Sequence, residues 1–208
     1  MPSASIRVLC VDDHPAMREG VAAYMHSAPD MQLVAEAVNG REAIEQYRKS
    51  RPDITLMDLR LPDISGIDAL LAIRREFEHA RVIMLTTFDG DADIRRALEA
   101  GAQAYLLKTM SRSELLETIR KVHKGKRHVP SDVAARLAQH LGEVPLSRRE
   151  IEVLEKIAEG NRNMDIAAML FISEETVKGH IKHIMEKLDA NDRTEAVAIG
   201  VRRGIIHL

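Results

Sequence analysis

Short apolar runs alternate with longer stretches of helical spacing over the first 124 residues. In each longer stretch apolar residues recur at three- and four-residue steps, as at Met17, Val21 and Tyr24. The short runs lie at Ile6–Val11, Gln32–Ala37, Ile54–Met57, Val82–Thr86 and Ala104–Leu107. Buried strands that alternate with helices are typical of a parallel sheet covered on both faces. The pattern therefore predicts an α/β domain with five parallel strands, doubly wound by right-handed crossovers.

The pattern changes after Val122. Residues 125–145 are poor in large apolar side chains and predict a linker that contains one short helix, Val133–Leu141. From Leu146 onward every segment indicates helix, beginning with the capping box formed by Ser147 and Glu150. The later helices are predicted at 163–170, 173–188 and 193–203. The chain is therefore predicted to hold an α/β domain over 1–124, the linker 125–145, and an all-α four-helix domain over 146–208.

Composition narrows the class of protein. With 45% apolar and 30% charged residues the chain is expected to fold, and no apolar run approaches the ~18 residues of a membrane span. The first ten residues lack the pattern of a signal peptide, so a cytoplasmic protein is expected. The single cysteine, Cys10, excludes an internal disulfide and a cysteine-based zinc site. A net charge of −2 argues against a grossly polybasic nucleic-acid binder.

Charged and hydroxyl side chains stand at the carboxyl ends of the predicted strands. Asp12 and Asp13 end the first strand, and the others are Asp58, Thr86 and Lys108 after the third, fourth and fifth. Ligands bind at this rim of an open α/β sheet. Clustered carboxylates favour Mg²⁺, and a carboxylate beside Mg²⁺ and a lysine can attack a phosphoryl group. Taken singly, each residue has an ordinary explanation: Asp13 as a helix cap near Pro15, Thr86 as a strand former and Lys108 as a solvated cation.

Four segments of this first domain, VDDHPAMREG, MDLRLPDISG, VIMLTTFD and GAQAYLLKTM, resemble the receiver domain of bacterial two-component response regulators over about residues 6–124. The resemblance implies a flavodoxin-like sheet whose Asp58 accepts a phosphoryl group. It implies that Thr86 and Lys108 contact that group and that Tyr105 is an aromatic switch residue. It implies Mg²⁺ as the cofactor, held by Asp12, Asp13, Asp58 and the backbone carbonyl of Arg60. The resemblance further implies a protein that is not an enzyme, apart from phosphorylation and dephosphorylation of its own Asp58.

The short helix at 163–170 and the longer one at 173–188 form a predicted helix-turn-helix. Apolar side chains at three- and four-residue steps would place one face of the longer helix inward. That spacing leaves Lys178 and Lys182 outward, one turn apart, as donors for the bases and phosphates of a major groove. The alternative is that both lysines only solvate an exposed face and pair with Glu174 or Glu186. The pattern alone leaves both interpretations open.

The segment from Leu146 to Leu188 resembles the LuxR-type (NarL/FixJ) DNA-binding domain, over about 146–206. The resemblance implies DNA contacts by Thr176, Lys178, Gly179, His180, Lys182 and His183. Met164 stands where the family commonly has lysine, and Gly179 where a larger side chain is frequent. The resemblance also implies a dimer interface on the last helix, at Ala196, Val197, Ile199, Gly200 and Val201, although these residues can equally close the core.

Together the two resemblances predict a phosphorylation-switched DNA-binding transcriptional regulator. Its expected partners are a sensor histidine kinase, a second copy of the chain, double-stranded DNA with an inverted-repeat site and RNA polymerase, with no membrane. The distribution of charged residues agrees with DNA binding only in one short segment of the second domain. Residues 145–208 carry 10 basic and 11 acidic residues, but Lys178–Lys187 holds three lysines and two histidines against Glu186 alone.

Three other functions compete with this prediction. A Mg²⁺-dependent phosphohydrolase with a helical appendage is disfavoured, because such enzymes place nucleophile and acid–base aspartates two residues apart after one strand. A regulator with a vestigial acidic site finds no support, because all five site residues are present. A protein-interaction module that oligomerises without DNA stays open until the role of Lys178 and Lys182 is tested.

Overall fold

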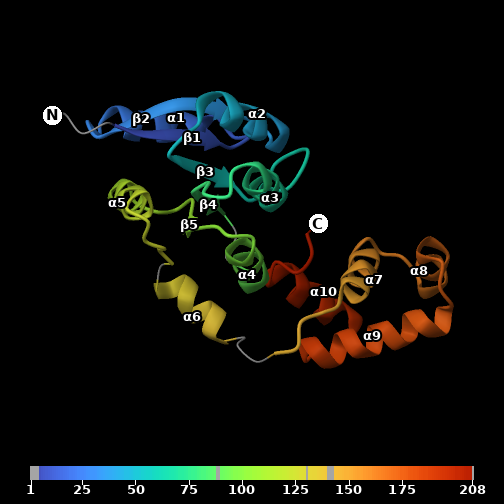
Figure 1. Cartoon of the computed structure of the whole chain (residues 1–208). Coiled ribbons are helices and arrows are strands. Elements are labelled where there is room, and N and C mark those ends of the chain that lie inside the picture. Colours follow the sequence, from blue (N-terminus) through green and yellow to red (C-terminus); the bar gives the residue numbers. More distant parts are fainter. Residues whose placement is uncertain (1–4, 88–89, 130, 140–142, 208) are drawn as a thin grey trace. The chain divides into compact units, whose positions relative to one another are not determined.

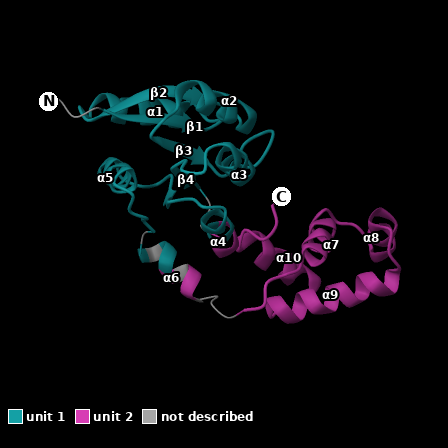
Figure 2. Ribbon diagram, viewed as in Figure 1, with its two compact units in different colours: residues 1–88, 94–134 teal, residues 89–93, 135–208 magenta. Residues whose placement is uncertain are grey.

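The computed structural model describes residues 5–87, 90–129, 131–139 and 143–207. It divides into two compact units, residues 1–88 with 94–134 and residues 89–93 with 135–208 (Figure 2). Within the described residues no helix is long and apolar enough to cross a membrane.

The first unit is built on a five-stranded, wholly parallel sheet in the order β2-β1-β3-β4-β5. The strands are β1 (Ile6–Val11), β2 (Met31–Ala37), β3 (Ile54–Asp58), β4 (Val82–Thr86) and β5 (Ala104–Leu107). The strand order reverses at β1, which pairs with β2 on one edge and β3 on the other. The ends of β1 and β3 therefore flank the point at which open α/β sheets bind ligands.

Five helices accompany these strands: α1 (Pro15–His26), α2 (Gly40–Ser50), α3 (Gly66–Glu76), α4 (Asp91–Glu99) and α5 (Arg112–His123). Val21 of α1 and Leu115 of α5 share one core with alternate strand residues such as Val8, Leu56 and Ile83. Intervening residues such as Leu9, Met57 and Met84 are buried too, and α5 and α3 lie on opposite sides of the sheet (Figure 1). The predicted doubly wound α/β fold is confirmed.

Cys10 lies in β1 among these core residues and is fully buried. Burial, and after it the nearby charge of Asp12, raises the pKa of this thiol to about 12. A thiol that stays protonated and out of solvent is a poor nucleophile. Cys10 is therefore a packing residue, as its place in an apolar run predicts.

The second unit contains α7 (Arg148–Ala158), α8 (Asn163–Leu170), α9 (Glu174–Leu188) and α10 (Arg193–Arg202), which pack around one core. The predicted capping box is present: Ser147 accepts from the backbone N–H of Glu150, and the Glu150 carboxylate accepts from that of Ser147. The linker helix, α6, spans Ser131–Gln139, two residues earlier at its start than predicted. Its predicted end, Leu141, lies outside the described residues.

Gly66, the first residue of α3, lies against the end of β3. A Cβ at this position would stand 1.9 Å from the carbonyl oxygen of Asp58. Gly66→Ala is therefore expected to displace the strand end and to destabilise the first unit by about 1–3 kcal/mol or more. Amide hydrogen exchange of β3 and α3 in the full chain measures this loss.

The matched control for this substitution is Gly20→Ala in α1, where nothing lies within 4 Å of the added methyl group. It should leave exchange unchanged or slow it, since alanine in a helix is about 0.5–1 kcal/mol more favourable than glycine. Equal protection of β3 in both variants would contradict the close approach of Gly66 to Asp58.

Candidate functional site

Three side chains from three strands meet at the carboxyl edge of the sheet. Asp12 directly follows β1, Asp58 is the last residue of β3, and Lys108 follows β5. The Lys108 Nζ lies 2.7 Å from Oδ2 of Asp12 and 2.7 Å from Oδ2 of Asp58. Both carboxylates are buried, with 1% and 4% of the residue exposed. The structure thus brings together strand ends that lie far apart in the sequence.

Burial and charge act on these groups in opposite directions. Burial raises the pKa of Asp58, an effect that Lys108 reduces and Asp12 strengthens, so that the pKa stays above its usual value. Burial alone would lower the pKa of Lys108, but hydrogen bonds to Asp12 and Asp58 raise it above its usual value. One ammonium therefore balances only one of two buried carboxylates, and the pocket retains a negative charge.

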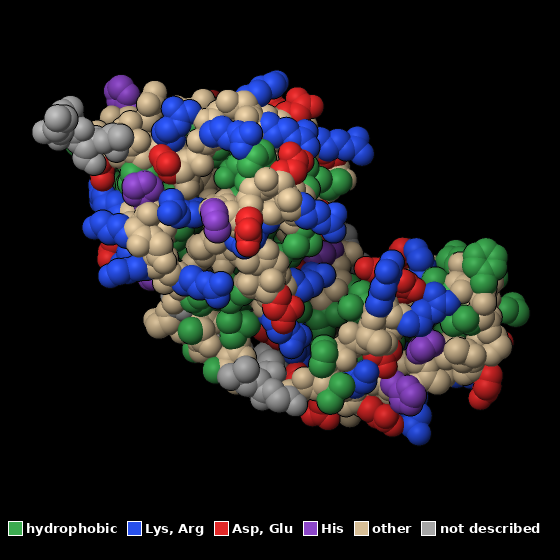
Figure 3. All heavy atoms as spheres, viewed as in Figure 1, with side chains coloured by type: hydrophobic (Ala, Val, Ile, Leu, Met, Phe, Trp, Pro, Cys, Tyr) green, Lys and Arg blue, Asp and Glu red, His purple; other side chains and the backbone are tan. Residues whose placement is uncertain are grey.

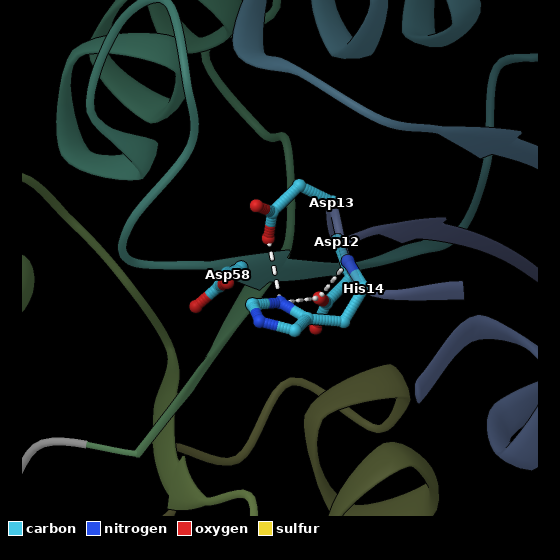
Figure 4. Close-up of side chains that lie close together, drawn as sticks. All are labelled: Asp12, Asp13, His14 and Asp58. Carbon is cyan, nitrogen blue, oxygen red and sulfur yellow. Dashed lines mark hydrogen bonds and ion pairs between the residues drawn. The ribbon is translucent and has the colours of Figure 1, made fainter. Parts of the chain in front are cut away.

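Asp13 and His14 complete the cluster (Figure 4). The His14 Nδ1 lies 2.7 Å from Oδ1 of Asp13 and 3.3 Å from Oδ1 of Asp12. One ligand atom from each of Asp12, Asp13, His14 and Asp58 lies within 4.8 Å of the others. The N-cap of α1 is His14 and not Asp13, so the interpretation of Asp13 as a helix cap is wrong. Sequence reasoning missed His14, although it directly follows the two aspartates.

Thr86 and Arg60 lie next to this cluster, and Tyr105 lies further back, in the second position of β5. Thr86 ends β4 and is fully buried, and its carbonyl accepts from the Lys108 N–H at 2.7 Å. Tyr105 lies in β5 with its ring fully buried, next to Met84 of β4. The backbone N–H of Arg60 donates to Oδ1 of Asp58 at 3.4 Å. The predicted residues Asp12, Asp13, Asp58, Thr86 and Lys108 thus lie at one edge of the sheet, whereas Tyr105 lies within β5.

Helix α9 presents one buried and one exposed face. Val177, Ile184 and Leu188 are buried in the core of the second unit, and Ile181 is partly buried against it. Ser173 caps the helix by accepting from the backbone N–H of Thr176 at 3.1 Å. The inward spacing predicted from the sequence is therefore confirmed by the burial of these residues.

The outward face of α9 carries the lysines. Their side chains are 53% exposed at Lys178 and 74% at Lys182, with Nζ 3.2 Å from Glu174 and 3.8 Å from Glu186 respectively. Exposed pairs of this kind contribute at most about 1 kcal/mol. Both ammonium groups can therefore exchange a carboxylate for a phosphate, although the pairs also fit the interpretation of a solvated face.

The other residues predicted to contact DNA also lie on α9. Thr176 and His183 are exposed, and His180 is partly buried. Gly179 has open space around the position of a Cβ, so its lack of a side chain is not required by packing.

Lys187, near the end of α9, has a different role from the other two lysines. Its Nζ lies 2.7 Å from Oε2 of Glu150, a buried carboxylate that also accepts from the Ser147 N–H at 2.6 Å. This contact joins α7 to α9 and holds Lys187 in place. The sequence groups Lys187 with the other lysines of a locally cationic helix, because nothing in the local pattern marks a partner 37 residues away.

The contact also makes the stability of the second unit depend on pH. Burial alone would raise the pKa of Glu150, but bonds from Lys187 and Ser147 bring it below its ordinary value of 4.5. A depressed carboxyl pKa contributes stability above the unfolded pKa and loses it as pH falls through the folded value. Glu150→Gln should therefore lower the free energy of hydrogen-exchange protection of α7 and α9 by about 1–2 kcal/mol at neutral pH. The loss should be smaller below pH ~4, because the wild-type carboxylate is then protonated as well.

Glu155→Gln, on the solvent-exposed side of α7, is the control and should leave protection unchanged. An equal loss of protection in Glu150→Gln at neutral and acid pH would contradict the role of an ionised Glu150.

The residues predicted for dimerisation fall into two groups. Ala196, Ile199 and Gly200 are buried within the second unit, where a Cβ on Gly200 would meet Leu154 at 2.9 Å. Val197 and Val201 are only partly buried. The three buried residues close the core of the second unit. Of the residues predicted for dimerisation, only Val197 and Val201 are therefore accessible to a partner.

Comparison with known proteins agrees with this geometry. Residues 8–120 match the response regulator receiver domain, and residues 144–199 match the bacterial regulatory proteins of the luxR family. The chain is 40% identical over 210 residues to the transcriptional regulatory protein LiaR of Bacillus subtilis, with 97% of this chain and 100% of LiaR covered. It is 35% identical over 207 residues to the response regulator protein VraR of Staphylococcus aureus, with 97% and 99% covered.

Solved structures that resemble this chain are also those of response regulators. The response regulator ChrA of a heme-sensing two-component system is 36% identical, with a TM-score of 0.59 and 98% of this chain and 100% of ChrA covered. The response regulator RcsB in complex with DNA is 25% identical, with a TM-score of 0.70 and 95% and 98% covered. The fold and the acidic site define a two-component response regulator that binds DNA and regulates transcription. Within that class, the chain belongs to the luxR family.

Proposed function

We propose that this regulator is switched by phosphoryl transfer from a sensor histidine kinase to Asp58. The observation that supports the proposal is the Asp58 carboxylate at the end of β3, beside Asp12 and 2.7 Å from the Lys108 ammonium. In the transfer, a carboxylate oxygen of Asp58 forms a bond to phosphorus as the bond between phosphorus and the kinase imidazole breaks. Lys108 then offsets the charge of the phosphoryl oxygens.

The donor set of the pocket fits Mg²⁺. Its carboxylates supply the oxygen ligands that this ion prefers, and the pocket carries more negative charge than Lys108 balances. The carboxylates of Asp12, Asp13 and Asp58 and the carbonyl of Arg60 would hold the ion. When bound, Mg²⁺ neutralises charge on the oxygens of the transferring group.

The same pocket connects phosphorylation to the rest of the first unit. A phosphoryl group on Asp58 gives the Thr86 hydroxyl a strong acceptor, and Thr86 moves toward it. Tyr105, buried on the adjacent strand β5, follows and alters the surface around α4 and β5. The switch acts as a shift of population toward a conformation that binds DNA as a dimer.

Helix α9 is the proposed DNA-reading helix. Its exposed face offers Thr176, Lys178, Lys182 and His183, and its N-terminus is capped by Ser173. A dimer would present two such helices to the half-sites of an inverted repeat. RNA polymerase is a further proposed partner of the bound dimer, and the cytoplasm is the proposed location. The proposed limits are 1–124 for the receiver, 125–145 for the linker and 146–208 for the DNA-binding domain.

Genomic footprinting of the full chain, with and without a small phosphodonor and Mg²⁺, tests the whole proposal. Phosphorylation is expected to raise the affinity for a set of inverted-repeat sites by at least about tenfold, as typical coupling energies of 1–3 kcal/mol allow. Identical footprints in both conditions would contradict the switch.

A further inference from the structure

Helix α8 exposes large apolar side chains to solvent. The exposed fraction is 69% at Met164, 50% at Met169 and 94% at Phe171, which directly follows the helix. Hydrophobic side chains accordingly gather over α8 in Figure 3. A helix that is apolar on all sides is normally buried on all sides. Ile166 and Ala167 bury one side of α8 in the core of the second unit, whereas the fold leaves the other apolar side open.

The backbone at Phe171 gives a second, independent sign that this face has a function. Phe171 is the C-cap of α8 and lies in the left-handed region, with a φ of 54°. Glycine is the usual residue in this conformation, because it has no Cβ that clashes with the backbone. Folding and solubility both favour glycine at this position. Neither therefore accounts for an almost fully exposed phenylalanine.

This face borders the DNA-reading helix but does not fit DNA itself. Phe171 stands two residues before Ser173, the N-cap of α9, so a partner on the face lies close to bound DNA. Asp165 is the only charged residue of α8, all of which the structure describes, and Met164 stands where the family commonly has lysine. Because phosphates are bound by cations, the apolar face calls for a protein.

The size of the face decides what kind of protein complex it can form. A large side chain buries roughly 200 Å², so Met164, Met169 and Phe171 together bury roughly 600 Å² at most. A stable interface in free solution needs about 800 Å² from each partner. A smaller contact is sufficient when both proteins are held on the same DNA, because the effective concentration then reaches the ~millimolar range. The partner is therefore a protein that occupies the DNA beside the regulator.

We propose that Met164, Met169 and Phe171 form the contact surface for a DNA-bound domain of RNA polymerase, which offers an apolar patch bordered by basic side chains. The inference rests on the proposed function, because the contact forms on DNA that the phosphorylated regulator occupies. A domain that binds DNA is basic near the DNA, and so complements Asp165 and the 89% exposed side chain of Glu175. A second copy of the chain would instead bring its own Asp165 against this one, and like charges oppose that contact.

Photo-crosslinking on DNA tests which partner occupies the face. Phe171 is replaced by p-benzoylphenylalanine in the full chain, which is phosphorylated and mixed with purified bacterial RNA polymerase holoenzyme and promoter DNA that carries a footprinted site. Irradiation is expected to link the chain to a polymerase subunit, and only when the DNA carries the site. The same analogue at Leu71, 39% exposed on α3 of the first unit, is the control and should give no such link. A link from position 171 to a second copy of the chain or to DNA in place of polymerase would overturn the proposal.

The double variant Met164→Gln with Phe171→Gly measures the strength of the contact. Glutamine is a good helix former and glycine suits the left-handed cap, so the second unit should fold as before. A favourable contact couples the binding of the two proteins, so the wild type should raise the affinity of polymerase for the promoter by about fivefold or more. The double variant should lose this gain while its own DNA affinity changes less than about twofold. Leu71→Gln is the control and should keep the gain, and an equal gain in the double variant would contradict the assigned surface.

Footprints of the regulator without polymerase separate this inference from the proposed function. If phosphorylation raises the DNA affinity of the wild type while neither the crosslink nor the gain is observed, only the polymerase surface is refuted. If phosphorylation leaves the DNA affinity of the wild type unchanged, the proposed switch fails as well.

Discussion

Asp58→Asn is expected to abolish phosphorylation of the chain by a small phosphodonor and Mg²⁺. The amide cannot form the acyl phosphate, and it no longer carries the charge that pairs with Lys108 at 2.7 Å. Intact-mass measurement should show one added phosphoryl group on the wild type and none on the variant. Because the nucleophile itself is removed, the loss should be complete.

Asp63→Asn is the matched control for this prediction. Asp63 lies exposed in the loop after β3 and accepts from the backbone N–H groups of Gly40 and Arg41, away from Lys108. Its variant should take up one phosphoryl group as the wild type does. A single phosphoryl group that persists on Asp58→Asn would remove Asp58 from its assigned role.

The double substitution of Lys178 and Lys182 by alanine should weaken DNA binding by at least about tenfold. Each lysine offers one exposed ammonium on the outward face of α9, held only by surface carboxylates. Loss of a phosphate contact also lowers the slope of log affinity against log salt by about 0.9. Binding of the phosphorylated full chain to its site, measured across a salt series, tests both effects.

A second double variant, Lys49→Ala with Lys121→Ala, provides the control. Each of these lysines pairs with a glutamate four residues earlier, as Lys178 does, but lies on α2 or α5 of the first unit. This control changes the net charge by the same amount and should retain both affinity and salt slope. Equal weakening by the two double variants would indicate that only net charge matters and would contradict a role for α9.

Much of the fold was predictable because its signals are local. The alternation of apolar runs and helical spacing indicated the five strands, and the Ser147 capping box indicated the start of α7. The pocket was predictable for a related reason. Parallel strands end at the same edge of a sheet, so Asp12, Asp58 and Lys108 could be placed together without coordinates.

Other features depend on contacts between distant residues and could not be predicted. The pairing of Lys187 with Glu150 is decided by how α9 packs on α7. The division of the α10 residues, with Ile199 buried and Val201 only partly so, depends on which side of the helix meets the core. The contacts of His14 with Asp12 and Asp13 were not predicted, because they depend on where the imidazole ring lies relative to the two aspartates.

The assembly of the pocket from three strands has a consequence for the cell. Asp58 and Lys108 are 50 residues apart in the sequence and meet only once β1, β3 and β5 lie in the same sheet. A nascent chain that ends before β5 therefore lacks the arrangement proposed to receive the phosphoryl group. Under the proposed function, only copies with a completed sheet respond to the signal.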